Sequence, residues 1–587
     1  MTAGSIVKEH VFNQLRRKDS NMSTTRMDKR KALLKRKEKD KRIYFTGIFF
    51  TFLFVLLICR LYFIQVLNGE EYAARVRRQQ IDHIELKKVS GNIIDRNGYS
   101  FTSAGEALML KVIPKAVGFN DDAYDVIEAL TGVVKKEFLR SSSEVFTVPV
   151  VNFNKALIEA VESDYHPGVL CYNESIRYND KSLARHVIGY LRKSDGVPMS
   201  GIEKALQNYL HPGLESYVNV FSDAANRPLF SLGYQISHPE RKCYDVQLTL
   251  NYNIQEVLEQ TLDQYPGRRH GGIVLNAMNG EILALASRPQ FQQYDPGALK
   301  TNGMDSSFLS IPMEQYPFGS VFKIIVAAAA LDSGRYSEST LFTCTGGIQA
   351  GNRWMPCHAH TGGLGTITFR EAFAHSCNDT FIRIAQDLGG ETIIEMAKRF
   401  GLGEEINIEL PNAPGLLMKK DEYSGTGIAN LAIGQGTIMV TPLQAADMIT
   451  TIVNNGKRKT LKLVDGVVDS EGNFVQYHPE QNKGSTDTRV ISQKTAETLI
   501  RFMGDVTEYG TGKNASCALI GGTAGKTGTP QVAGDLKSSN YAWFTGFFPK
   551  DKPRYIIVVL SLEEGGAADM AAPVFLDIAK GIWKAAK

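Results

Sequence analysis

The chain contains 587 residues, of which 43% are hydrophobic and 22% are charged, so it is too long for one ordinary domain and too apolar to be disordered. Its formal net charge of +4 comes from the N-terminus, because residues 1–42 contain 14 Lys/Arg and only 5 Asp/Glu. The rest of the chain is slightly acidic, which argues against a nucleic-acid-binding protein, since a basic surface for phosphates should lie on the folded body.

Residues 43–66 are the first predicted element, a membrane-spanning helix. An apolar run over residues 43–59 is extended by a second one over residues 61–67, and about 20 apolar residues match a hydrocarbon core of roughly 30 Å. The Lys/Arg-rich residues before the run predict a cytoplasmic N-terminus. Because no small-residue cleavage pattern follows, we expect an uncleaved, single-pass anchor with the remaining chain outside the cell membrane.

The sequence pattern changes near residue 245. Residues 67–245 are polar and mixed, with short apolar runs, and predict an α+β spacer domain. Residues 246–587 predict strands, then a helical block, then strands and a last helix. The expected strands are residues 246–250, 271–275, 282–286, 541–547 and 555–560, and the first and last helices are residues 254–262 and 572–585. This order favours helices packed on an antiparallel sheet assembled from both ends of the domain.

Seven cysteines are too few and too scattered for a disulfide scaffold. Cys344 and Cys357 are close enough in sequence to be bridged, which an oxidising exterior permits. The run Cys357-His358-Ala-His360 also has the residue types of a metal site. A structural zinc site normally has four ligands at recognisable spacing, however, and no fourth is evident, so we expect neither a metal nor another cofactor.

The first chemical motif is Gly319-Ser320-Val-Phe-Lys323, which opens a strongly apolar helical run. A spacing of three residues puts Ser320 and Lys323 on one helix face. A lysine desolvated beside an apolar helix has a lowered pKa and can take the proton of a serine nucleophile. The start of a helix also favours developing negative charge. A single Ser-x-x-Lys match is more often an N-cap serine followed by a surface lysine. The motif therefore indicates catalysis only if further motifs accompany it.

Two further motifs of this kind follow in the sequence. Ser376-Cys377-Asn378 ends a helical pattern and contributes a hydroxyl and an amide. Gly525-Lys526-Thr527-Gly528-Thr529 precedes the strand at residue 541, where the glycines allow close approach of a substrate backbone and the ammonium can hold a carboxylate. Each motif alone is typical of turns and caps. Their order and spacing beyond a membrane anchor make the joint signal strong.

This set resembles the Ser-x-x-Lys, Ser-x-Asn and Lys-Thr-Gly motifs of the penicillin-binding proteins and serine β-lactamases. The resemblance runs from about residue 245 to the end and includes residues 432–436, 440–444 and 542–546. It implies an α+β multidomain protein with an N-terminal transmembrane helix, an elongated α+β pedestal and a C-terminal transpeptidase domain of helices around an antiparallel sheet. The expected division is a basic cytoplasmic tail (1–42), the anchor (43–66), the pedestal (67–245) and the transpeptidase domain (246–587).

The N-terminal half narrows the resemblance to class B, the monofunctional penicillin-binding proteins. Their non-catalytic domain is similar to residues 91–98, 177, 186–190 and 201–203 of this chain, and no acidic motif of a glycosyltransferase domain is found. Two positions depart from the family pattern. Ser90 stands in place of an arginine, which bears on the contacts of the pedestal, and Phe318 stands in place of a proline, which hardly affects the chemistry.

The resemblance implies that Ser320 attacks the D-Ala-D-Ala bond of a peptidoglycan stem peptide and releases the last D-alanine. Lys323 is then the base. Ser376, hydrogen-bonded between Lys323 and Lys526, relays the proton to the leaving amine, and Asn378 holds the substrate amide. The amine of a second stem attacks the acyl-enzyme to make a cross-link, and β-lactams trap the same serine.

The same resemblance assigns the substrate carboxylate to Lys526 with Thr527, Gly528 and Thr529. The backbone N–H groups of Ser320 and Thr529 form the oxyanion hole. A class B enzyme also implies a partner that polymerises glycan strands, namely a multi-spanning SEDS-family glycosyltransferase. No nucleic acid is expected as a partner.

The sequence also bears on several alternative functions. A β-lactamase needs an activated water, and no glutamate can be assigned to that task. A D,D-carboxypeptidase differs only in using water as the acceptor, and the spacer favours transpeptidation. A penicillin-binding sensor or an inactive scaffold fits poorly with three intact motifs and a short tail. A nucleotide-binding loop is excluded by spacing, since Gly-x4-Gly-Lys-Thr requires glycine where Ile520 stands.

Overall fold

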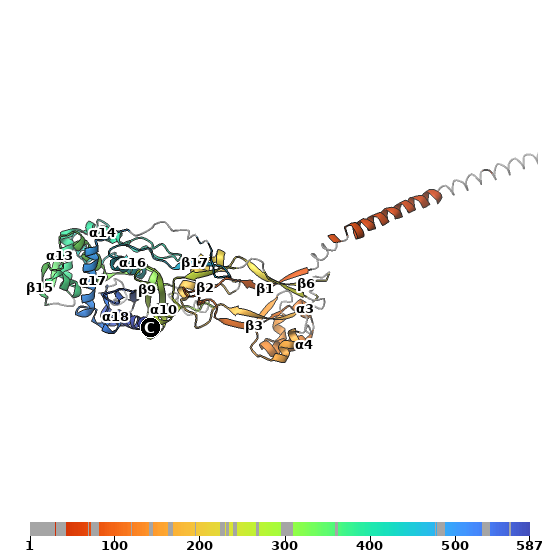
Figure 1. Ribbon diagram of the computed structural model, residues 1–587, viewed down its shortest axis with the longest axis horizontal. Helices are drawn as coiled ribbons and strands as arrows, with labels where there is room; N and C mark the ends of the chain where they lie inside the picture. Colours follow the sequence, from red (N-terminus) through yellow and green to blue (C-terminus); the bar gives the residue numbers. More distant parts are fainter. Residues whose placement is uncertain are drawn as a thin grey trace, which may run out of the picture. The chain divides into compact units, whose positions relative to one another are not determined.

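The computed structural model describes residues 30, 43–68, 70–71, 81–118, 120–139, 145–162, 168–193, 195–223, 229, 234–238, 243–265, 269–294, 309–357, 362–475, 477, 488–530, 541–562 and 565–586 (Figure 1). The chain forms two compact units. The first comprises Met1–Ile84 with Val218–Gln235, and the second comprises Glu85–Tyr217 with Ile236–Lys587. Apart from Arg30, the basic residues 1–42 lie outside the described part.

The first unit contains a helix over Ile43–Leu67, whose last turn is the π-helix η1 (Phe63–Leu67). Its 25 residues have a mean hydropathy of 2.4, and none of the side chains in its apolar window is buried. Length and composition suffice to cross a membrane, in agreement with the predicted anchor. The strands β1 (Ile81–Val89), β6 (Leu214–Phe221) and β7 (Tyr234–Ser237) form a three-stranded sheet in the order β1-β6-β7, and the division between the units falls within these strands.

The early part of the second unit contains a three-stranded sheet with small helices. The central strand β3 (Gly105–Val112) pairs antiparallel with β4 (Phe146–Pro149) and β5 (Val169–Ile176). The longest helix here, α4 (Asp121–Thr131), is capped by the Asn120 side chain and ends at Gly132 in the left-handed conformation. Its apolar face packs with strand residues in a separate core. The short helices are α3 (Pro114–Val117), α5 (Lys135–Phe138), α6 (Lys155–Glu162), α7 (Arg185–Ile188), α8 (Gly201–Ala205) and α9 (Gln207–Leu210).

A buried carboxylate organises the residues that resemble the class B pedestal. Glu203 is fully buried and pairs with Arg177, whose Nε donates to Glu203 Oε1 at 2.5 Å and whose Nη1 donates to the Gly91 carbonyl at 2.9 Å. His211 Nε2 lies 2.6 Å from the same carboxylate, and its Nδ1 lies 2.9 Å from Ser90 Oγ. Burial raises the pKa of Glu203, but Arg177 and His211 outweigh it, so the net shift is downward. The serine that departs from the family pattern therefore holds a histidine that contacts the buried acid.

The larger part of the second unit is built on a five-stranded antiparallel sheet in the order β10-β9-β21-β20-β19. Its strands are β9 (His270–Asn276), β10 (Ile282–Arg288), β19 (Ala524–Gly528), β20 (Ala542–Phe548) and β21 (Tyr555–Ser561). Strands from both ends of this part meet because β21 pairs with β9 from Tyr555↔Asn276 to Ser561↔His270. The predicted sheet and its α+β class are therefore confirmed.

Helices cover both faces of this sheet, because successive strand residues point to opposite sides. Phe544, Ile557 and Val559 pack with α10 (Tyr252–Asp263) and α18 (Ala567–Ala585), whereas Trp543 and Val558 belong to the core on the other face. The helices α10 and α18 lie side by side although they come from opposite ends of this part of the chain (Figure 1). The sequence pattern predicts that the last helix begins at residue 572, but in the structure it begins at Ala567. Pro573 therefore lies inside the helix and does not mark its start.

The other face is covered by the helical block. Its helices are α11 (Lys323–Asp332), α12 (Phe369–Ala374), α13 (Asn378–Leu388), α14 (Gly390–Arg399), α15 (Thr426–Ala432), α16 (Pro442–Val453) and α17 (Gln493–Glu508). Short 3-10 helices are η5 (Ile311–Met313), η6 (Gly319–Phe322), η7 (Lys513–Ala515) and η8 (Ala518–Ile520). Of these elements, α16, α17, η5 and η6 contact the five-stranded sheet, and α11 packs against α13, α14 and α17. The helices η7 and η8 instead contact α18 on the first face.

Smaller sheets complete the second unit. Three are two-stranded: β11 (Tyr316–Pro317) with β16 (Met439–Val440), β12 (Leu341–Cys344) with β15 (Gly365–Thr368), and β13 (Gly347–Ala350) with β14 (Arg353–Pro356). A four-stranded sheet has the order β18-β17-β8-β2, with β2 (Ile93–Ile94), β8 (Asp245–Leu248), β17 (Val464–Val468) and β18 (Phe474–Val475). In it β2 pairs parallel with β8, which joins the pedestal-like residues to the body.

Candidate active site

Ser320 lies on η6, directly before α11. All residues of α11 from Lys323 to Ala330 are buried. A helix that is apolar on all sides is stable when it is surrounded by other elements, and α11 lies at the centre of the helical block. Ser320 itself is only partly buried. The turn before it is held by a hydrogen bond from Gly319 N to the Gly434 carbonyl at 2.9 Å and by contact between the rings of Phe318 and Trp543. Ser320 is thus presented by a rigid element.

Lys323, the first residue of α11, is fully buried three residues after Ser320. Its Nζ donates to the Ser376 carbonyl at 2.6 Å, to Ser376 Oγ at 3.2 Å and to Asn378 Oδ1 at 2.7 Å. The ring of Phe381 lies 5.4 Å from the same nitrogen. Burial lowers the pKa of Lys323 to about 8, although Cys377 and Cys357 act in the opposite direction. An amine with this pKa can be neutral near physiological pH, as a general base requires.

Ser376 lies in the turn between α12 and α13. Its backbone has φ +55, the left-handed region that a residue with a side chain seldom adopts. The helix before it is fixed by a capping box of Thr368 and Glu371. This turn places Ser376 Oγ as acceptor for both Lys323 Nζ, at 3.2 Å, and Lys526 Nζ, at 3.1 Å. One hydroxyl therefore connects the two buried ammonium groups.

Lys526 lies on the edge strand β19 and is fully buried. Besides Ser376, its Nζ donates to the Thr527 carbonyl at 3.0 Å and lies 5.9 Å from the centre of the Phe373 ring. Burial lowers the pKa of Lys526 well below its ordinary value, and the nearby charge of Lys323 lowers it further. The site thus disfavours a positive charge on Lys526 beside Lys323, and a nearby anion would favour that charge again.

The rest of the third motif lies along the same strand. Gly528 passes close to the turn around Ser320, since a Cβ there would lie 2.7 Å from Val321 Cγ2 and 3.0 Å from the Phe318 carbonyl. Thr527 is buried and its Oγ1 lies 2.6 Å from Thr511 Oγ1. Thr529 is exposed, and its hydroxyl accepts a hydrogen bond from Ala567 N at 3.1 Å. Thr527 on β19 and Thr529 just after it therefore offer hydroxyl groups beside the turn around Ser320.

Asn378 is the first residue of α13 and is largely buried. Its Oδ1 accepts from Lys323, and its Nδ2 donates to the Pro356 carbonyl at 2.8 Å. In this structure both ends of the amide contact protein groups. The Asn378 side chain therefore holds Lys323 Nζ in position.

Sequence reasoning did not identify four residues that shape this site. Thr511 extends the row of hydroxyl groups, and Phe373 and Phe381 place aromatic rings over the two ammonium groups. Gly434 allows Gly319, directly before Ser320, to approach closely, because a Cβ on Gly434 would lie 2.0 Å from the Gly319 carbonyl. Residues 432–436 were singled out for family resemblance, but no local pattern assigns a role to the other three.

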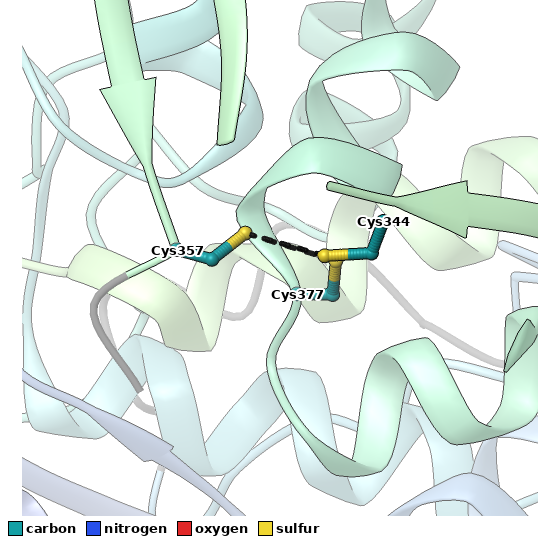
Figure 2. Close-up of side chains that lie close together, drawn as sticks. All are labelled: Cys344, Cys357 and Cys377. Atoms are coloured by element: carbon teal, nitrogen blue, oxygen red, sulfur yellow. Dashed lines mark hydrogen bonds between the residues drawn. The ribbon is translucent and has the colours of Figure 1, made fainter. Parts of the chain in front are cut away.

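Three buried thiols lie next to the site (Figure 2). Cys344 Sγ is 3.8 Å from Cys357 Sγ, which is 3.9 Å from Cys377 Sγ. All seven cysteines belong to the described residues and are free, so the possible Cys344–Cys357 bridge is not formed here. His358 and His360, which the sequence places after Cys357, lie outside the described residues.

The chain is similar to known proteins over most of its length. The family described as "Penicillin binding protein transpeptidase domain" matches residues 271–580. Stage V sporulation protein D of Bacillus subtilis is 26% identical over 563 residues, covering 91% of this chain and 84% of that protein. The peptidoglycan D,D-transpeptidase MrdA of Acinetobacter baumannii is 26% identical, covering 92% and 88%. A chain from a solved peptidoglycan synthase complex, described as coordinating polymerization and crosslinking, has a TM-score of 0.68 at 24% identity and covers 92% and 98%.

Proposed function

The chain belongs to the penicillin-binding protein transpeptidase family, and we propose that it is a class B peptidoglycan D,D-transpeptidase that works through an acyl-enzyme on Ser320. The observation that carries the assignment is the hydroxyl of Ser376, which accepts hydrogen bonds from the two buried lysines Lys323 and Lys526. A proton can pass along this connection between the nucleophile side and the substrate side of the site.

In the first half-reaction, Lys323 in its neutral form takes the proton of Ser320, and the alkoxide attacks the carbonyl of the D-Ala-D-Ala bond. The tetrahedral oxyanion is stabilised by the backbone N–H groups of Ser320 and Thr529. When the C–N bond breaks, Ser376 passes the proton to the departing amine, and D-alanine leaves. Ser320 then carries the stem peptide as an ester.

In the second half-reaction, the amine of a neighbouring stem attacks the ester and gives its proton back through Lys323. A new amide forms and Ser320 is regenerated. A β-lactam acylates the same serine when its ring C–N bond breaks, but the released amine stays attached to the acyl group and does not leave the site, so the ester persists. Water in place of the amine would make the enzyme a D,D-carboxypeptidase, a reaction that differs only in the acceptor.

Substrate recognition is assigned to the edge of β19. Lys526 binds the terminal carboxylate, whose negative charge favours the ammonium form that burial otherwise disfavours. Thr527, Gly528 and Thr529 lie along the same edge and contribute hydroxyl and backbone contacts. Asn378 holds the substrate amide as well as Lys323.

The membrane helix supports a wider arrangement, which we also propose. The basic residues 1–42 lie in the cytoplasm, residues 43–66 span the membrane, and the pedestal (67–245) and transpeptidase domain (246–587) lie outside. The solved synthase complex in which a similar chain takes part is described as coordinating polymerization with crosslinking. The class B resemblance specifies the polymerising partner further, and we assign a SEDS-family glycosyltransferase to the anchor and pedestal.

The test is to incubate the purified full chain in detergent with a fluorescent penicillin and to map the adduct, and in parallel to supply a stem pentapeptide with an acceptor amine. We expect a stable adduct on Ser320, no adduct in Ser320→Ala, and D-alanine release coupled to cross-linked dimer. D-Alanine release without dimer would assign the carboxypeptidase reaction. Hydrolysis of the drug without an adduct would make the chain a β-lactamase and contradict the proposal.

A further inference from the structure

The three thiols beside the active site form a cluster that the transpeptidase mechanism does not use. Cys344 ends β12, Cys357 follows β14 and Cys377 precedes α13, so the cluster joins three separate elements (Figure 2). Their side chains point toward one another, and the three sulfur atoms all lie within 4.8 Å of one another. Each residue is at most 3% exposed.

The spacing of the sulfur atoms has a chemical meaning. Zinc binds thiolates at about 2.3 Å in a tetrahedron, and two such thiolates are separated by about 3.8 Å. The Cys344–Cys357 and Cys357–Cys377 sulfur distances in the cluster are 3.8 Å and 3.9 Å. A disulfide requires about 2.0 Å between its sulfur atoms. It would also join only two of the three thiols and would give the third no chemical role. The observed distances therefore fit a shared ion better than a covalent pair.

Hydrogen-bond donors and the start of a helix lie beside two of the three sulfur atoms. Asp379 N donates to Cys357 Sγ at 3.4 Å, and the Thr380 hydroxyl donates to Cys377 Sγ at 3.4 Å. Cys377 is the N-cap of the 11-residue helix α13, whose free N–H groups carry partial positive charge. Hydrogen bonds to ligand atoms orient and stabilise metal sites.

We propose that Cys344, Cys357 and Cys377 bind one zinc ion, which fastens the β12 and β14 strands to the Ser376-Cys377-Asn378 turn. Binding releases the thiol protons to solvent and needs no oxidant. Three thiolates leave a fourth position of the tetrahedron for another ligand, and the proposal rests on the thiols alone. Because Cys377 lies between Ser376 and Asn378, the ion would hold in place the two motif residues that contact Lys323.

The test is the metal content of the full chain purified in detergent without added metal or chelator, measured by mass spectrometry of the elements. We expect about one zinc per chain in the wild type and in the control Cys243→Ser, which removes a cysteine outside the cluster. The zinc should be lost from Cys357→Ser. Replacement of zinc by Co²⁺ should give a thiolate-to-cobalt charge-transfer band in the wild type and not in that variant.

The wild-type measurements keep the test independent of whether a variant folds. Removal of the ion from the wild type by a chelator should lower the Tm, and added Zn²⁺ should restore it. A wild-type chain that binds no zinc as purified or after reduction and incubation with Zn²⁺ overturns the proposal. So does a disulfide between two of the three cysteines in the native protein, or copper or iron in place of zinc.

Discussion

The pH dependence of acylation gives the sharpest test of the proposed base. With a pKa of about 8 for Lys323, the neutral fraction at pH 7 is roughly one-tenth, so the second-order rate of acylation by penicillin should rise about tenfold between pH 7 and pH 9 and then level. The perturbation that we choose is Asn378→Asp. It keeps the size of the side chain but puts a carboxylate where Asn378 Oδ1 now lies, 2.7 Å from Lys323 Nζ.

The structure sets the size of the effect. An opposite charge at this distance favours the ammonium form and typically moves a pKa by about one to three units. The midpoint of the profile should therefore shift upward by at least about one unit, and the rate at pH 7 should fall by roughly tenfold or more. A lower plateau at high pH would report the loss of the substrate-amide contact, and the midpoint separates the two effects.

The assay is stopped-flow acylation by a fluorescent penicillin from about pH 6 to about pH 10. Asn279→Asp is the matched control, because Asn279 lies in the exposed part of the β9–β10 turn and its side-chain oxygen accepts from Glu281 N, which aspartate also allows. It should leave the midpoint unchanged. A flat wild-type profile, or a midpoint that Asn378→Asp does not raise, would refute Lys323 as the base.

Three further variants test recognition and packing. Lys526→Ala removes the charged group assigned to the carboxylate and should slow acylation by about 10- to 100-fold, the value of a charge-assisted hydrogen bond, whereas an unchanged rate contradicts that role. Gly528→Ala puts a Cβ 2.7 Å from Val321 Cγ2 and should cost about 1–3 kcal/mol in chemical denaturation; Gly362→Ala, with no neighbour within 4 Å, is its control. Glu203→Gln leaves a buried arginine without its carboxylate and should cost about 3–5 kcal/mol, while the exposed Glu391→Gln should cost little, and equal losses would argue against the buried network.

The sequence was informative where a local pattern of residues is compatible with few structures. The apolar run over residues 43–66 could only be a helix that is long enough to span a membrane, and it is a helix in the structure. The strand and helix periods at both ends of the transpeptidase domain led to the antiparallel sheet that the register of β9 with β21 confirms. The three motifs sufficed for the family, which the match over residues 271–580 then showed.

Other features depend on contacts between residues that are far apart in the chain. Sequence spacing alone does not show that Lys526 and Lys323 are both buried and share the hydroxyl of Ser376, and the lowered pKa values follow from that burial. Ser90 is a departure from the family pattern in the sequence, and only the fold shows that it contacts His211.

The three cysteines show the same limit most clearly. The sequence suggests a pair, Cys344 with Cys357, because those two are neighbours in the chain. The fold adds Cys377 from the catalytic motif and brings all three sulfurs within 4.8 Å. Periodicity and motif spacing are local properties that the chain carries in its order, whereas burial and the meeting of distant side chains arise only when the helical block closes over the sheet.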